Sequence, residues 1–229
     1  MDNAMHTFFE QSLGRTPISS MASQGHKLYE ALVHHRFYEV ITNAFPILSA
    51  HVPKQMLEDA IVDFIKHAPK TPYIWQVPFY FWKFAQEHKS LNLPYVEDLL
   101  WYEWSEIELM MEVYEPLHVS TFSWNEEWQR DPSVRLRKLS YRVFESNFSE
   151  KGSFFLLAWY DTAQQTACYK EVGEVLYTFL EYLEHCTFEQ SIQKLMEETQ
   201  SERKTIENYL QDALISLCNE GIIRTKENL

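Results

Sequence analysis

The fold is decided by residues 154–170, FFLLAWYDTAQQTACYK. Residues 154–160 form an apolar run with the length and the aromatic content of a buried strand. Residues 161–164 are polar and typical of a tight turn, and residues 165–170 have the composition of a second strand. We therefore expect a β-hairpin here, with residues 134–143 as a further strand on its N-terminal side.

Helical patterns return after the hairpin. Residues 172–184 carry an amphipathic apolar stripe, and Thr187 with Gln190 forms a capping box that starts another helix. Residues 202–219 have the clearest helical stripe in the chain; Gly221 should end that helix, and residues 222–224 resemble a short terminal strand. This order of strands, helices and a short strand predicts a small winged-helix-like α+β domain over residues 134–229.

The first half of the chain, residues 1–116, predicts an N-terminal helical bundle. Apolar stripes and helix-start signals mark helices at about 4–14, at 24–44, from Pro53, from Thr71-Pro72 and at 94–113. Pro78 should bend or restart the fourth of these helices, because proline lacks an amide donor. Residues 117–133 should form a linker, or an irregular strand with a loop. The fold class expected for the whole chain is mainly α, with α+β character.

Composition narrows the classes of function. The chain has 229 residues and a formal net charge of −13, which disfavours binding to nucleic acid phosphates and to anionic membrane surfaces. No apolar run approaches the roughly 20 residues that span a bilayer, and the N-terminus lacks the pattern of a signal peptide. The three cysteines form no CxxC pair and are expected to be reduced thiols. We expect a cytoplasmic protein that does not contact membranes.

No catalytic or metal-binding set stands out. The sequence contains no GxSxG, P-loop, dinucleotide fingerprint or HExxH motif. Bundle metal sites need Glu-x-x-His pairs from more than one helix, and this chain offers only Glu115-Pro-Leu-His118, where proline disrupts the turn. The neighbours His34 and His35 point in different directions on a helix. We therefore expect no cofactor, no metal site and no catalytic residue.

One basic cluster stands out in the first predicted strand. As a strand, it should place Arg135 and Arg137 on one face and Lys138 and Arg142 on the other. It has two interpretations. The cluster is a solvated edge strand protected by charge, or it binds an acidic peptide that is added to the sheet as a further strand.

The predicted helix 94–113 is rich in acidic and aromatic residues. Trp101, Tyr102 and Trp104 span a wide arc of this helix, so some of them should face another domain or a protein partner, where aromatic residues are favoured. With Glu103 and Glu106 they form the predicted partner interface. The alternative is that all three rings pack inside the chain, between its two domains.

The C-terminal module also permits a DNA-binding interpretation. Residues 187–229 carry eight acidic residues against five basic ones. A recognition helix with Glu202, Glu207 and Asp212 is poorly suited to the major groove. Winged-helix-like modules also bind proteins and peptides, so the fold does not decide the function.

Over about residues 7–115 the chain resembles the HvfC/BufC family, whose N-terminal region has also been labelled a DNA-binding domain. Four groups of residues appear in the family's order: Tyr29-x-x-x-Val33 before Ala44-Phe45-Pro46; His67-x-Pro69-x-Thr71-Pro72-Tyr73; Pro78-x-x-Phe81-x-x-Phe84; and Leu93-Pro94-Tyr95 followed by Leu99 and Tyr102-Glu103-Trp104-x-Glu106. The chain departs from the family pattern at Glu30, where a basic residue is common, and at residues 50–53, where many members have Leu-Gly.

The resemblance implies a role in maturing ribosomally made, post-translationally modified peptides (RiPPs). Members of this family work with a separate multinuclear non-haem iron oxidase that modifies cysteines in a precursor peptide, and the metal belongs to the oxidase. The leading hypothesis is therefore a non-catalytic partner that binds the precursor peptide and the oxidase. The alternative is a transcription regulator that uses its C-terminal module on DNA; a stand-alone enzyme is less favoured than either.

Overall fold

A computed structural model describes residues 24–67, 71, 73–89, 91–116, 121–145, 148 and 150–225. The helix predicted at residues 4–14 lies outside this part of the chain. The chain divides into two compact units, one ending at Trp104 and the other beginning at Ser105. The division falls inside a helix, upstream of the boundary expected at residue 116.

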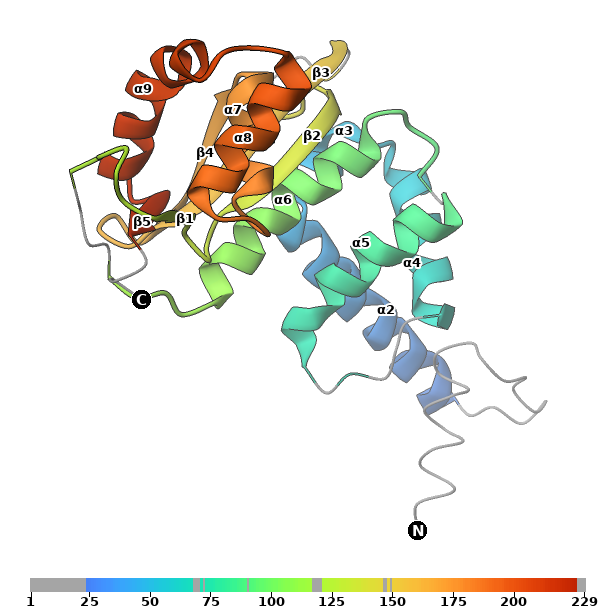
Figure 1. Cartoon of the computed structure of the whole chain (residues 1–229). Helices are drawn as coiled ribbons and strands as arrows, with labels where there is room; N and C mark the ends of the chain where they lie inside the picture. The colour runs from blue at the N-terminus through green and yellow to red at the C-terminus, as the bar shows by residue number, and fades with distance from the viewer. Residues whose placement is uncertain are drawn as a thin grey trace. The chain divides into compact units, whose positions relative to one another are not determined.

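The first unit is helical. Its elements are α2 (Gln24–Ala44), α3 (Pro46–His51), α4 (Lys54–His67), the 3-10 helix η1 (Ile74–Gln76), α5 (Val77–His88) and the first part of α6 (Val96–Met111), shown in Figure 1. Helix α3 lies between two expected helices, the one at residues 24–44 and the one that begins at Pro53, and was not predicted. An amide in the first turn of a helix has no partner within the helix. Proline, which lacks this amide, is therefore well suited to that position, and Pro46 begins α3. Pro78 restarts the chain as α5, as predicted.

Phenylalanine rings fill the core of the first unit. Phe45, Phe64 and Phe81 are fully buried, and the rings of Phe64 and Phe81 meet edge to face with centroids 5.4 Å apart. This geometry is the favourable arrangement of two aromatic quadrupoles. The core therefore fixes how α4 and α5 pack on each other.

The second unit contains the sheets. Strands β2 (Arg135–Tyr141), β3 (Lys151–Asp161) and β4 (Thr166–Val172) form an antiparallel sheet in the order β2-β3-β4. The predicted hairpin is confirmed: Asp161 Oδ1 accepts hydrogen bonds from the amides of Ala163 and Gln164 at 2.9 and 3.0 Å, which closes the turn. The short strands β1 (Trp128–Arg130) and β5 (Ile223–Thr225) pair with each other.

Three helices complete the second unit: α7 (Glu174–Tyr182), α8 (Phe188–Thr199) and α9 (Arg203–Asn219). Helices α7 and α8 lie across one face of the β2-β3-β4 sheet (Figure 1) and share a buried core with Leu157 and Trp159 of β3. The predicted capping box is present, with Thr187 Oγ1 accepting from the Gln190 amide and Gln190 Oε1 accepting from the Thr187 amide. Gly221 adopts a φ of 70° after α9, as expected of a helix stop.

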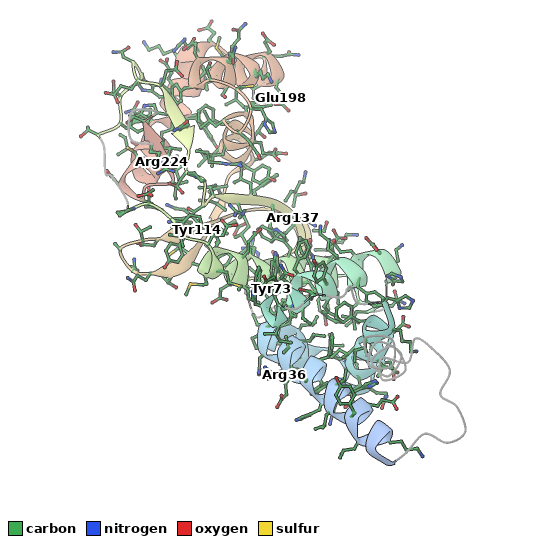
Figure 2. All side chains as sticks on the ribbon, turned by 90° about the horizontal axis from the view of Figure 1, so that it is seen from below. Arg36, Tyr73, Tyr114, Arg137, Glu198 and Arg224 are labelled. Atoms are coloured by element: carbon green, nitrogen blue, oxygen red, sulfur yellow. The ribbon has the colours of Figure 1, made fainter. Side chains whose placement is uncertain are left out.

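Part of the predicted linker belongs to this core. Trp128 of β1 is buried, Phe122 and Trp124 pack against the same cluster, and the Trp124 indole donates to Gln211 of α9 at 2.5 Å. Figure 2 draws side chains as sticks and labels Arg137 on β2 and Arg224 on β5. The mainly helical, α+β class is confirmed. No helix among the described residues has both the length and the apolar character needed to cross a bilayer.

Candidate peptide-binding strand and partner-binding helix

The basic cluster lies on an edge strand. Strand β2 pairs with β3 on one side and ends the sheet on the other. Arg135 lies opposite Ala158, Arg137 opposite Leu156 and Lys138 opposite Phe155. Since successive side chains of a strand point to opposite faces, Arg135 and Arg137 share one face and Lys138 lies on the other, as predicted.

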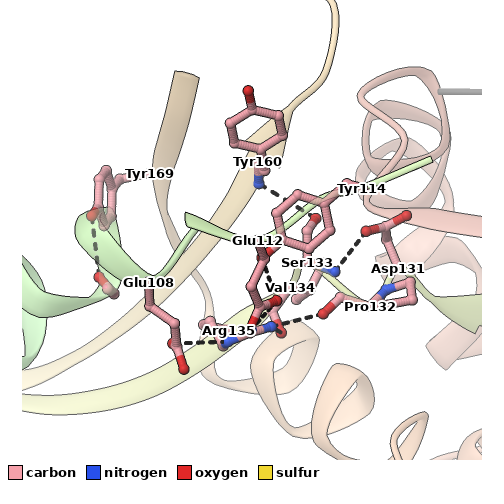
Figure 3. Close-up of polar contacts among 11 residues, drawn as sticks. Glu108, Glu112, Tyr114, Asp131, Pro132, Ser133, Val134, Arg135, Tyr160 and Tyr169 are labelled. Carbon is pink, nitrogen blue, oxygen red and sulfur yellow. Dashed lines mark hydrogen bonds and ion pairs between the residues drawn. The ribbon is translucent and has the colours of Figure 1, made fainter. Parts of the chain in front are cut away.

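Arg135 is held by the carboxylates of Glu108, in α6, and of Glu112, the residue that follows α6. Its Nε donates to Glu108 and its Nη2 donates to Glu112, both at 3.1 Å, while Nη1 donates to the carbonyl of Pro132 at 2.7 Å (Figure 3). Glu108 lies in the last turn of α6 and Glu112 directly follows the helix, and both carboxylates contact the one guanidinium. The side chain of Arg135 is 25% exposed. Arg135 therefore joins β2 to the C-terminal part of α6.

Tyrosines surround this ion-pair network. The hydroxyl of Tyr114 donates to Glu112 at 2.8 Å, and its ring lies 5.2 Å from the ring of Tyr160. Burial and the hydrogen bond to Glu112 raise the pKa of Tyr114 well above its ordinary value. Burial alone would lower the pKa of Arg135, but the charge of Glu108, the hydrogen bond to Glu108 and the charges of Tyr114 and Glu112 together outweigh burial and raise that pKa. Both groups therefore keep their proton at neutral pH.

Arg142 does not lie on the face of the sheet that was predicted for it. Its guanidinium makes ion pairs with Glu145, Glu150 and Glu171 at 3.2, 3.3 and 2.8 Å and lies over the ring of Phe154 at 4.4 Å. Glu171 is opposite Leu156, which is itself opposite Arg137, so these contacts belong to the Arg137 face.

The prediction that Arg142 shares a face with Lys138 is therefore wrong. The pairing of β2 with β3 shifts register between Leu139 and Tyr141, and such an irregularity breaks the simple alternation of faces. Through its ion pairs, Arg142 links the connection between β2 and β3 to the sheet.

Lys138 differs from the two arginines with carboxylate partners. It is exposed, and its Nζ lies 5.2 Å from the centre of the Phe155 ring. Among the residues that the structure describes, no carboxylate lies within ion-pair distance of Lys138. Its charge is therefore available to a ligand that approaches the edge of β2. Arg137 is half-buried on the opposite face.

Tyr177 of α7 reaches this edge from the side of the helices. Its ring lies 5.0 Å from Phe155. Burial, the charge of Glu181 and a hydrogen bond to Glu181 raise the pKa of Tyr177 to about 12, and a hydrogen bond from the backbone of Lys138 opposes that rise. This contact was not predicted, because it depends on how α7 packs against the sheet, which no local pattern around Tyr177 indicates.

Glu103 of α6 accepts hydrogen bonds from the backbone of α3. Its Oε1 accepts from the amide of Ile47 at 2.6 Å and its Oε2 accepts from the amide of Leu48 at 3.0 Å. These amides belong to the first turn of α3, whose unpaired donors and positive dipole end favour a carboxylate. Glu103, from the Tyr102-Glu103-Trp104 motif, thus contacts the two residues that directly follow the Ala44-Phe45-Pro46 motif.

The predicted partner interface is only partly accessible. Trp101 and Trp104 are 8% and 6% exposed, and the ring of Trp104 stacks on Trp82 of α5 with centroids 6.4 Å apart. The buried tryptophans and the buried Glu103 cannot serve as surface anchors, which corrects that part of the prediction. Tyr102 is half-buried and Glu106 is exposed, so these two residues of the set remain candidates.

Comparisons with known proteins do not assign the chain to a family. No protein-family model matches the chain, and no curated protein is significantly similar to it. The resemblance to the HvfC/BufC family therefore rests on the motifs given above. Within the described ranges, no group of three or more histidine, cysteine, aspartate or glutamate side chains could hold a metal ion.

Proposed function

We propose that this protein is a non-catalytic partner in RiPP maturation, which binds a cysteine-containing precursor peptide and a multinuclear non-haem iron oxidase in the cytoplasm. The observation that carries the proposal is the position of β2 at the edge of its sheet with the exposed cation of Lys138 on it. An edge strand presents unpaired amides and carbonyls to which an extended peptide can be added.

The charges along β2 have different roles in this proposal. Arg135 and Arg142 already have carboxylate partners in the chain, so they stabilise the strand and its turn. Lys138 is left to attract an acidic side chain of the added peptide. The peptide would also approach Tyr177, whose ring lies 5.0 Å from that of Phe155, the residue opposite Lys138.

The oxidase is proposed to contact the exposed part of α6. Tyr102 and Glu106 are accessible there, and Glu97 adds an exposed acidic side chain in the first turn of the helix. The iron and the oxidative chemistry would belong to the oxidase, and this chain would supply binding and orientation. Enzyme complexes of this kind gain rate when a partner holds the substrate in place.

DNA binding by the C-terminal module is less well supported. Arg203, at the start of α9, makes ion pairs with Glu189 and Glu207. A guanidinium paired with two carboxylates is a poor phosphate ligand, and the net charge of −13 opposes binding to DNA.

A pull-down with each partner separately tests the proposal. The precursor peptide and the oxidase would be those encoded beside the gene for this protein. Lys138→Glu should weaken capture of the peptide and leave capture of the oxidase unchanged. Lys204→Glu, which reverses an exposed charge on α9, is the matched control and should change neither. If Lys138→Glu captures the peptide as well as the wild type does, binding at β2 is contradicted.

A further inference from the structure

Two histidines far apart in the sequence meet at the ends of two helices in the first unit. His67 is the last residue of α4 and His88 is the last residue of α5. Their ring centroids are 5.4 Å apart, with an angle of 37° between the ring planes. The sequence could not indicate this pair, because metal-binding motifs are recognised at short spacings and these residues come from separate helices.

Local hydrogen bonds fix the proton on both rings. The Nδ1 of His67 lies 2.9 Å from the carbonyl oxygen of Asp63, and the Nδ1 of His88 lies 3.2 Å from the carbonyl oxygen of Phe84. A carbonyl only accepts, so Nδ1 must carry the hydrogen in each ring. The lone pair of the neutral imidazole is then on Nε2. Metal-binding histidines commonly have this arrangement, with the second nitrogen donating to a backbone carbonyl.

The ring of Phe84 supports both imidazoles. It stacks on His88 with centroids 4.2 Å apart and on His67 with centroids 5.7 Å apart. The carboxylate of Asp63 lies 3.9 Å from His67 Nδ1 and also 3.9 Å from Lys66 Nζ. In the part of the chain that the structure describes, neither Nε2 makes a hydrogen bond or an ion pair, so both are available to an added ligand.

We propose that His67 and His88 bind one divalent transition-metal ion, with Zn²⁺ as its type. Zinc–nitrogen bonds are roughly 2.0–2.1 Å long, so two imidazoles on one tetrahedral zinc have centroids about 5 Å apart, close to the separation seen here. Water completes the coordination, since the described residues add no third protein ligand. The ion joins the C-terminal ends of α4 and α5. With two protein ligands it exchanges readily and is removed by a chelator.

Zinc titration of the full chain by calorimetry tests the site. After treatment with a chelator, the wild type should bind one equivalent of Zn²⁺ and should not bind Mg²⁺, which prefers oxygen ligands. His67→Ala and His88→Ala should each abolish the binding. His51→Ala is the matched control, because His51 makes the same Nδ1 contact to a carbonyl four residues earlier, at 2.8 Å; it should bind Zn²⁺ like the wild type.

Thermal melts complete the test. Without metal, the three variants should melt like the wild type, since these histidines are exposed. Added Zn²⁺ should raise the melting temperature of the wild type and of His51→Ala only. The proposal is overturned if the wild type binds no Zn²⁺, or if both variants of the pair bind it like the wild type, which would point to the cysteines instead.

Discussion

Glu103 and Arg135 both use their charge inside the protein. Glu103 accepts hydrogen bonds from two backbone amides at the start of α3, and Arg135 of β2 binds Glu108 of α6 and Glu112 directly after it. Each is a charged group largely removed from water, and its surroundings supply the hydrogen bonds that make this possible. From the sequence both looked like surface residues available to a partner. Replacing either residue should therefore lower the free energy of unfolding.

Replacing Glu103 should destabilise the first unit. Glu103→Ala leaves the amides of Ile47 and Leu48 without their acceptor, and we expect the free energy of unfolding to fall by about 2–3 kcal/mol. Urea unfolding followed by tryptophan fluorescence measures the change. Glu106→Ala, an exposed position on the same helix, should stay within about 0.5 kcal/mol of the wild type. Equal effects of the two substitutions would show that Glu103 is not a cap.

Replacing Arg135 should destabilise the second unit. Arg135→Ala removes a guanidinium bound by Glu108, Glu112 and the Pro132 carbonyl, and we expect a loss of about 1–3 kcal/mol in urea unfolding. Lys138→Ala, on the opposite face of the same strand, should change stability by less than about 0.5 kcal/mol. A neutral result for Arg135→Ala would return this residue to the set of free peptide-binding cations.

At the scale of elements, local signals predicted most of the fold. The capping box at Thr187, the positive φ of Gly221 and the turn at Asp161 act within a few residues, so the sequence displays them directly. The pairing of β1 with β5 was not predicted, because its strands are three residues long and about a hundred positions apart. The face of Arg142 was missed for a similar reason, since a register shift depends on the partner strand.

The position of Tyr177, at the contact between α7 and β2, predicts that the protein loses stability at alkaline pH. Burial raises the pKa of Tyr177 to about 12, against about 10 for a free tyrosine. Folding therefore favours the protonated phenol. Its stabilisation is complete below about pH 10 and is lost as the pH rises through about 12.

Urea unfolding at about pH 9 and about pH 11.5 measures this loss. The wild type should lose more stability between these two conditions than Tyr177→Phe, which has no phenol to ionise. Tyr209→Phe, at an exposed tyrosine of α9, should behave like the wild type. If Tyr177→Phe shows the full wild-type loss, the phenol is not held at this edge.

At the scale of the whole molecule, the net charge predicts that the protein does not bind duplex DNA. At about 150 mM salt, binding to random duplex DNA should be negligible, because a chain of net charge −13 gains little from counterion release. A mobility-shift assay measures this. Submicromolar binding with a steep salt dependence would instead support the DNA-binding alternative and would direct attention to α9.

The central claim is that a precursor peptide adds to the edge of β2, and amide hydrogen exchange tests it most directly. The exchange of the full chain would be compared with and without the precursor peptide encoded beside its gene. We expect slower exchange in β2, residues Arg135–Tyr141, because an added strand pairs with its outer amides. Strand β4, Thr166–Val172, is the other edge of the same sheet and serves as the internal control, with unchanged exchange. Unchanged exchange in β2 at saturating peptide, or protection at β4 alone, would contradict the account.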